Sequence, residues 1–232
     1  MGQSMRSIHD NLQAVRKRIE RAAEAAGRDP AAVRLLAVSK THAAAAIEAA
    51  YRAGQRAFGE NYVQEALEKM DALRGLAIEW HLVGPVQGNK TRLAAERFQW
   101  VQTLDRERIA RRLSEQRPAE LPALNVLVQV NVSGEASKSG VAPHDVKSLV
   151  NVVKTLPRLR LRGLMAIPEP GADRAQFQGL KALYDELQAE FGFDTLSLGM
   201  SEDMEQAIAA GSTLVRIGTA IFGERRRVKD AA

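Results

Sequence analysis

The hydrophobic positions of the chain follow two patterns, and the change comes near residue 30. In the first segment, apolar side chains recur at the spacing of one helix face. They are Ile8, Leu12, Val15, Ile19, Ala22, Ala23 and Ala26. Ser7 can cap the start of this helix, and Gly27 followed by Pro30 can end it. Residues 1–29 are therefore predicted to form an N-terminal helix.

After this helix, short apolar runs alternate with stretches of helical periodicity. The predicted strands are residues 34–39, 57–59, 79–83, 100–103, 125–131, 160–166, 195–198 and 213–217. The predicted helices are residues 43–53, 62–73, 90–97, 106–116, 145–156, 175–191 and 202–210. Parallel strands need a crossover helix between them, so this alternation predicts a parallel sheet.

The number of predicted strands favours one architecture. Eight strands, each followed by a helix, are typical of a single (β/α)₈ barrel of the TIM type, with the N-terminal helix as an extra element packed on it. The alternative is an open doubly wound sheet, which would bind nucleotides through a G-x-G-x-x-G turn after its first strand. Here that turn reads S-K-T-H. With no linker in the sequence, residues 1–232 are predicted to form one α/β domain.

Composition narrows the possible chemistry. The chain has 232 residues, 45% hydrophobic and 26% charged, which is typical of a folded globular protein. The absence of cysteine excludes disulfides, thiolate metal sites and a cysteine nucleophile. The four histidines lie far apart, so we expect no metal site built by the protein. They are His9, His42, His81 and His144. With no visible secretion signal and no apolar run of about 20 residues, we expect a cytoplasmic protein without a membrane partner.

The net charge of +5 raises the question of a nucleic-acid partner. Five arginines lie between residues 106 and 117, and three more, Arg225–Arg227, lie near the C-terminus. Acidic residues interrupt the first group, and aromatic residues make up only 5% of the chain. We therefore interpret the first group as a solvated helix face and residues 224–232 as a charged tail, and we expect no nucleic-acid partner. A phosphate-bearing small ligand would also explain some positive charge.

Candidate functional residues follow the strands, because a barrel of this type has its active site at the C-terminal strand ends. These candidates are Lys40, Glu60, Asn61, His81, Asn131, Met165, residues 199–201 and residues 216–219. Lys40 is the most informative, since it follows the apolar run LLAV. Partial desolvation there would lower the pKa of its amine and let it form a Schiff base with a carbonyl compound. Alternatively, Lys40 only extends to solvent from a strand end.

The last strands offer a phosphate site. Gly218 permits close approach of a ligand, and Thr219 and Ser201 supply hydroxyl groups where barrels frequently bind phosphate. Glu202 and Asp203 would then have to point away from the site. Arg216 either forms a structural ion pair or donates to the ring nitrogen of a bound heterocycle.

Six runs along the chain resemble one known family. They are LLAVSKTH (35–42), FGENYVQE (58–65), EWHLVGPVQGNK (79–90), RGLMAI (162–167), LSLGMSEDMEQAI (196–208) and VRIGTAIFGER (215–225). In this order they closely resemble the pyridoxal phosphate homeostasis proteins. The resemblance implies a fold similar to the N-terminal barrel domain of alanine racemase and pyridoxal 5′-phosphate (PLP) as the cofactor.

The resemblance also implies a role for each candidate. Lys40 would carry PLP as a Schiff base, and Arg216 would face the pyridine nitrogen. Ser201, Gly218 and Thr219 would hold the phosphate, and Asn61 and Met200 would line the ring pocket, with His81 nearby. The implied function is intracellular PLP (vitamin B6) homeostasis without established catalysis, with PLP-dependent apo-enzymes as possible recipients. We expect a monomer.

Two enzymatic alternatives remain open at this point. A PLP-dependent amino-acid racemase or decarboxylase would need a second acid or base opposite Lys40, and Tyr62 is the tyrosine nearest a strand end. A Schiff-base aldolase for sugar phosphates could use Glu60 for proton transfer. Lys138, in the loop after the fifth strand, could capture the aldehyde transiently during loading or release, or could simply be a solvated lysine.

Overall fold

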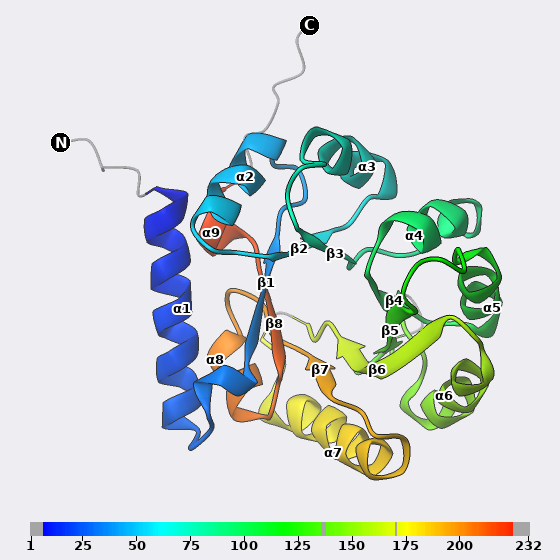
Figure 1. Ribbon diagram of the computed structural model, residues 1–232. Coiled ribbons are helices and arrows are strands. Elements are labelled where there is room, and N and C mark those ends of the chain that lie inside the picture. Colours follow the sequence, from blue (N-terminus) through cyan, green and yellow to red (C-terminus); the bar gives the residue numbers. More distant parts are fainter. Residues whose placement is uncertain (1–6, 136–137, 170, 225–232) are drawn as a thin grey trace, which may run out of the picture.

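Eight parallel strands form a closed barrel in the computed structural model, which describes residues 7–135, 138–169 and 171–224 (Figure 1). The strands are β1 (Arg34–Val38), β2 (Ala57–Glu60), β3 (Glu79–Leu82), β4 (Trp100–Leu104), β5 (Leu124–Val130), β6 (Leu159–Ala166), β7 (Thr195–Ser197) and β8 (Leu214–Ile217). Pairing of β1 with β8 closes the barrel, with Arg34 opposite Leu214 and Ala37 opposite Ile217. The predicted (β/α)₈ barrel is confirmed.

A helix follows every strand and lies on the outside of the barrel (Figure 1). The α-helices are α1 (Ile8–Ala25), α2 (Ala44–Arg52), α3 (Val63–Ala72), α4 (Thr91–Arg97), α5 (Glu107–Gln116), α6 (Val146–Thr155), α7 (Arg174–Phe191), α8 (Met204–Ala209) and α9 (Thr219–Phe222). Three short 3₁₀ helices accompany them, namely η1 (Pro30–Ala32), η2 (Gly88–Lys90) and η3 (Pro143–Asp145). The predicted strands and most predicted helices agree with these bounds to within one residue at each end.

Helix α8 is shorter than predicted. The sequence pattern predicts a helix over residues 202–210, but the helix begins at Met204. Residues 201–203 form a turn instead, in which the backbone N–H of Met200 donates to Asp203 Oδ1 at 2.5 Å. Because the carboxylate of Asp203 accepts a hydrogen bond from the backbone of this turn, the residues before Met204 are held outside the helix.

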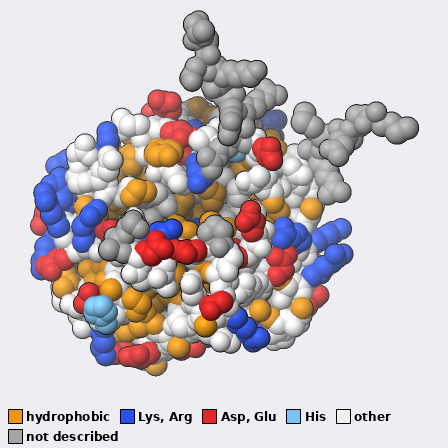
Figure 2. All heavy atoms as spheres, turned by 180° about the vertical axis from the view of Figure 1, so that it is seen from behind, with side chains coloured by type: hydrophobic (Ala, Val, Ile, Leu, Met, Phe, Trp, Pro, Cys, Tyr) orange, Lys and Arg blue, Asp and Glu red, His pale blue; other side chains and the backbone are white. Residues whose placement is uncertain are grey.

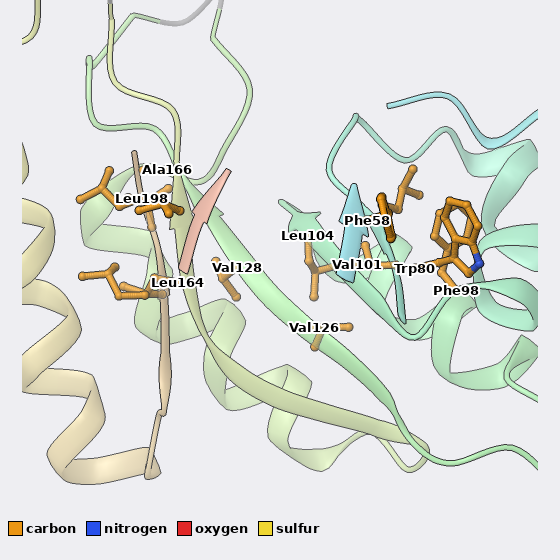
Figure 3. Close-up of a cluster of buried hydrophobic side chains, with 14 of the residues drawn as sticks. Phe58, Trp80, Phe98, Val101, Leu104, Val126, Val128, Leu164, Ala166 and Leu198 are labelled. Atoms are coloured by element: carbon orange, nitrogen blue, oxygen red, sulfur yellow. The ribbon is translucent and has the colours of Figure 1, made fainter. Parts of the chain in front are cut away.

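The main hydrophobic core lies between the strands and the helices. Outward-facing strand residues such as Phe58, Val101 and Leu164 are fully buried there, together with Phe98 (Figure 3). Burial of each such side chain contributes about 1.5–3 kcal/mol. The inside of the barrel holds two smaller apolar clusters, and polar side chains occupy much of the remaining interior.

Helix α1 covers the outer side of α8 and α9, as expected for the extra N-terminal element. A capping box between Ser7 and Asp10 starts it, and its apolar face is buried. Polar contacts add to this packing, since Asn11 Nδ2 donates to the carbonyl of Ile221 at 3.0 Å and Arg28 Nη1 donates to that of Ile208 at 2.6 Å. The helix therefore stabilises the last β–α units.

Gly163 illustrates how tightly the barrel closes. Its φ is +150°, and a Cβ atom there would lie 1.9 Å from the carbonyl oxygen of Thr195 on β7. Any larger residue would separate β6 from β7, so glycine is required at this position.

The arginine-rich segment belongs largely to α5 and its flanks. Arg108 and Arg111 are exposed, as a solvated helix face requires. Arg117 departs from the expectation, because it is buried and its Nη1 donates to the carbonyls of Ala95 and Phe98 at 2.6 and 2.8 Å. Arg225–Arg227 and the rest of the predicted tail after residue 224 lie outside the described residues. Among the helices of the described part, none has the length and apolar character needed to cross a membrane.

Candidate functional site

A cavity of about 610 Å³ opens at the C-terminal ends of the strands. Its volume lies within the ~300–1,000 Å³ of typical small-molecule sites. Seven of the eight predicted site residues line it, and they are Lys40, Asn61, Met200, Ser201, Arg216, Gly218 and Thr219. They come from the ends of β1, β2, β7 and β8, which are neighbours in the closed barrel.

Lys40 occupies a turn directly after β1, and both of its flanking peptide groups are held by α3. Lys69 Nζ donates to the carbonyl of Ser39 at 2.8 Å, and the N–H of Thr41 donates to Glu65 Oε1 at 2.5 Å. Glu65 and Lys69 are themselves paired at 2.6 Å. Thr41 has a φ of +66°, which is rare for a β-branched residue. We call Glu65 and Lys69 the α3 clamp, since they fix the backbone on both sides of Lys40.

Glu60 does not line the cavity, although it ends β2. Its fully buried carboxylate faces outward from the barrel, where it accepts from Ser39 Oγ at 2.6 Å and from Lys69 Nζ at 2.8 Å. Burial raises the pKa of Glu60, and the charge of Lys69 only partly opposes this. Glu60 therefore supports the turn that carries Lys40 and is not placed for proton transfer in the cavity.

Arg216 brings a buried cation to the cavity. Its side chain is 5% exposed, with Nη1 donating to Ser197 Oγ and Nη2 donating to the carbonyl of Ala166, both at 2.8 Å. Burial lowers the pKa of Arg216 to about 10, and the charge of Asp203 opposes this effect. The guanidinium is still protonated at neutral pH and can only donate hydrogen bonds.

Two residues with hydroxyl groups and a glycine line the cavity from the ends of the adjacent strands β7 and β8. Gly218 precedes α9 and Thr219 begins it, while Ser201 follows β7. A Cβ atom on Gly218 would lie 3.1 Å from the carbonyl oxygen of Val38 on β1. Glycine therefore lets the end of β8 approach β1, and this close approach brings Thr219 toward the turn that carries Lys40.

His81 departs from the expectation that it lies near the ring pocket. It is fully buried inside the barrel and does not line the cavity. Its ring stacks on that of Trp100, and its Nε2 lies 2.8 Å from Oε1 of Glu79, at the N-terminal end of β3. The ring thus points toward the barrel end opposite the cavity. Burial lowers its pKa, so His81 is neutral at pH 7.

Acidic residues also line the cavity, and they include Glu202 and Asp203, whose carboxylates would have to point away from a phosphate held by Ser201. Most of these carboxylates have partners of their own. Asp203 accepts from the backbone of Met200, and Glu205 pairs with Arg18 at 2.8 Å. Figure 2 shows the molecule from the side opposite to Figure 1, with acidic side chains gathered near the middle of that face and most Lys and Arg toward its left and right edges.

Lys138 lies close to this cavity. Its Nζ is 3.5 Å from Oε1 of Glu169, and Glu169 lines the cavity. The side chain of Lys138 is about half exposed. Its suggested role in capturing an aldehyde therefore stays a prediction.

The sequence interpretation missed several cavity residues. His42, two residues beyond Lys40, lines the cavity and packs on the ring of Phe222. Ile167 and Glu169 come from the loop after β6, whereas the candidate chosen from that strand, Met165, points into the barrel interior. Strand ends indicated the correct loops, but the side-chain alternation within each strand was needed to choose the residues.

Comparison with known proteins gives three findings. Residues 11–226 match the family model described as alanine racemase, N-terminal domain. A pyridoxal phosphate homeostasis protein of Pseudomonas aeruginosa is 60% identical over 223 residues, covering 95% of this chain and 97% of that protein. The structure of PipY from Synechococcus elongatus PCC7942 with PLP bound is 36% identical, with a TM-score of 0.82, and covers 94% of this chain and 100% of that one.

Proteins with much lower sequence identity share the same barrel fold. An alanine racemase from Clostridium difficile has a TM-score of 0.72 at 13% identity and covers 96% of this chain and 59% of that protein. At this level of identity the likeness shows a shared barrel fold alone.

Proposed function

This chain belongs to the pyridoxal phosphate homeostasis protein family, and from that premise we propose that it carries PLP as a Schiff base on Lys40 and takes part in PLP (vitamin B6) homeostasis in the cytoplasm. The observation that carries the proposal is the set of groups in one cavity. A primary amine, a buried guanidinium and two hydroxyl groups line the same cavity, which has a volume of about 610 Å³. These groups fit an aldehyde, an acceptor ring nitrogen and a phosphate respectively.

When bound, PLP supplies an aldehyde that reacts with amines and a ring that can withdraw electrons. Lys40 would provide the amine, held in place by the α3 clamp. Ser201, Gly218 and Thr219 would hold the phosphate through hydroxyl and backbone N–H groups. Asn61 and Met200 would border the ring. His81 contributes only from a distance, since it lies outside the cavity.

Arg216 favours carriage of the cofactor over catalysis. Because it stays protonated, it would donate to the ring nitrogen and leave that nitrogen unprotonated. An unprotonated ring withdraws electrons weakly, so a carbanion beside it is poorly stabilised. We therefore propose that the protein is not an enzyme.

The racemase alternative also loses its tyrosine candidate. Tyr62, the tyrosine nearest a strand end, is 60% exposed and is not among the residues that line the cavity. A racemase needs a second acid or base on the opposite face of the substrate. The aldolase alternative loses its candidate as well, because Glu60 is engaged by Ser39 and Lys69. We propose that residues 1–232 act as a single, monomeric unit that passes PLP to apo-enzymes.

Borohydride reduction followed by peptide mass mapping tests the proposal. We expect a yellow protein whose reduced form carries a pyridoxyl group on Lys40. Lys40→Ala should lose the adduct at this position, while Lys181→Ala, a helix lysine away from the cavity, should keep it. Failure of the wild-type protein to form any adduct after incubation with PLP would exclude the proposed function.

A further inference from the structure

Polar side chains form a continuous row through the barrel interior, from the cavity to the opposite end. Arg216 Nη1 lies 2.8 Å from Ser197 Oγ, which lies 2.7 Å from Gln102 Oε1. Gln102 Nε2 is 2.9 Å from His81 Nδ1, and His81 Nε2 is 2.8 Å from Glu79 Oε1. We call these five residues the interior relay. It joins four different strands and links the cavity to the N-terminal mouth of the barrel.

Each hydrogen bond of the relay has one possible direction. The carboxylate of Glu79 only accepts, so His81 donates to it from Nε2. His81 is neutral, so its Nδ1 carries a lone pair and accepts from the Gln102 amide. The oxygen of that amide then faces Ser197 and accepts from its hydroxyl. Ser197 Oγ in turn accepts from Arg216, so every bond points from the cation toward Glu79.

The relay is held rigidly at its far end. The His81 ring stacks on the Trp100 ring, with centroids 5.0 Å apart and planes 9° apart. Arg34 Nη2 donates to Glu79 Oε1 at 2.6 Å. Burial raises the pKa of Glu79, but the hydrogen bonds and charges of His81 and Arg34 outweigh this effect and lower the pKa to about 2. Glu79 is thus a fixed anion from pH 7 down to strongly acidic conditions.

The relay explains how the buried charge of Arg216 is stabilised without a carboxylate beside it. Arg216 is only 5% exposed, and a charge buried to this degree usually has a partner of opposite charge. In the described part of the chain, however, no carboxylate oxygen lies within 4.0 Å of its guanidinium. Ser197, Gln102 and His81 are each fully buried, so water does not compete for these bonds. Hydrogen bonds aligned in one direction polarise each other in a buried site and become stronger. The relay therefore orients the guanidinium and stabilises its charge.

We infer that Ser197, Gln102 and His81 are positioning residues that set the orientation of Arg216 toward the ring nitrogen of bound PLP. The inference rests on the proposed function, because Arg216 acts on the ring only if PLP binds in this cavity. None of the three touches the cavity itself. A change deep in the barrel, or at its opposite mouth, should then alter the environment of a cofactor that it does not contact.

The first test uses the full-length protein without added PLP. Nitrogen-15 NMR of the His81 ring should show the tautomer protonated at Nε2, with Nδ1 unprotonated. Glu79→Gln should shift the ring toward the other tautomer, because the glutamine amide can donate to Nε2. A wild-type ring protonated at Nδ1 would overturn the direction of the relay.

The second test uses PLP itself. Gln102→Leu and Glu79→Gln should each shift the visible absorption maximum of the bound cofactor and raise its Kd about tenfold, equal to ~1.4 kcal/mol. Ser114→Ala is the matched control, since it removes a buried hydrogen bond to Pro157 on the outer helix layer and should change neither property. Glu79 is partly exposed, so its variant should fold even if Gln102→Leu does not.

The outcomes distinguish a failure of the relay inference from a failure of the proposed function. If the wild-type protein binds PLP on Lys40 and both variants keep its spectrum and Kd, the relay inference is wrong while the proposed function stands. If the wild-type protein takes up no PLP, the proposed function fails first. The His81 tautomer then still reports whether the relay runs as described.

Discussion

A buried arginine and a lysine at a strand end give this cavity its chemistry. Both are inward-facing by alternation along their strands: Leu36 and Val38 precede Lys40 on the inner face, and Leu214 precedes Arg216. The same alternation turns Glu60 outward, toward α3. Residue type therefore suggests the candidates. Which of them face the cavity depends on the alternation of inward and outward side chains along each strand.

Lys138 is the residue whose role is most open to experiment. It lies beside Glu169 at the cavity rim, where a second amine can exchange with a Schiff base. We predict that Lys138→Ala slows the transfer of PLP to an apo-enzyme severalfold without changing the adduct on Lys40. Stopped-flow measurement of transfer checks this.

Lys147→Ala is a suitable control for Lys138, because Lys147 pairs with Glu190 at 2.6 Å and does not line the cavity. It should transfer PLP at the wild-type rate. Equal transfer rates for Lys138→Ala and the wild-type protein would show that Lys138 is only a solvated loop residue with no part in transfer.

At the scale of elements, α3 has a function beyond covering the sheet. Its clamp holds the peptide groups on both sides of Lys40 and keeps Thr41 at a positive φ. The sequence shows Glu65 and Lys69 only as an i,i+4 pair on a helix, which usually means an exposed ion pair. Their contact with a loop about one β–α unit earlier is a property of the packed barrel.

We predict that Lys69→Met lowers the free energy of unfolding by about 3–5 kcal/mol, because it leaves Glu60 buried without its cation. It should also weaken the Schiff base on Lys40, since the turn loses one of its two anchors. Urea unfolding and PLP titration measure the two effects. Glu65→Gln should weaken PLP binding with a smaller loss of stability, because Lys69 and Glu60 remain paired.

Lys181→Met is the control at this scale. It removes the same kind of i,i+4 pair, Lys181 with Asp185, from α7. Only a small loss of stability and no change in PLP binding are expected. If Lys69→Met binds PLP as well as this control does, the α3 clamp has no part in positioning Lys40.

For the whole molecule, ligand binding and folding are linked through the closed barrel. The cavity draws residues from both ends of the chain, so PLP can bind only when β1 and β8 are paired. At a PLP concentration about 100 times its Kd, binding should stabilise the fold by ~2.7 kcal/mol. For a protein of this size that predicts a rise in Tm of roughly 5–11 °C.

Differential scanning fluorimetry over a series of PLP concentrations checks this prediction. Lys40→Ala should show a much smaller rise, because the covalent bond is lost. A wild-type Tm that does not depend on PLP would mean that the cofactor binds the folded and unfolded chains equally, or not at all.

The sequence by itself determined the order of elements, the eight-stranded barrel and the loops that carry the site. These follow from local hydrophobic period and from the rule that parallel strands need crossover helices, so they need no knowledge of distant contacts. Lys40, Arg216 and Gly218 could be predicted for the same reason, because each lies within or just after the end of an apolar run.

Only the tertiary structure decided which side chains meet. Gln102 and Ser197 are 95 residues apart in the chain, and their contact depends on how the strands are staggered around the barrel. The same stagger sends His81 toward the N-terminal mouth and Arg216 toward the cavity, although both lie on the inner face. Local periodicity shows that a position faces inward, but the level it occupies along the barrel axis is fixed only when all eight strands close.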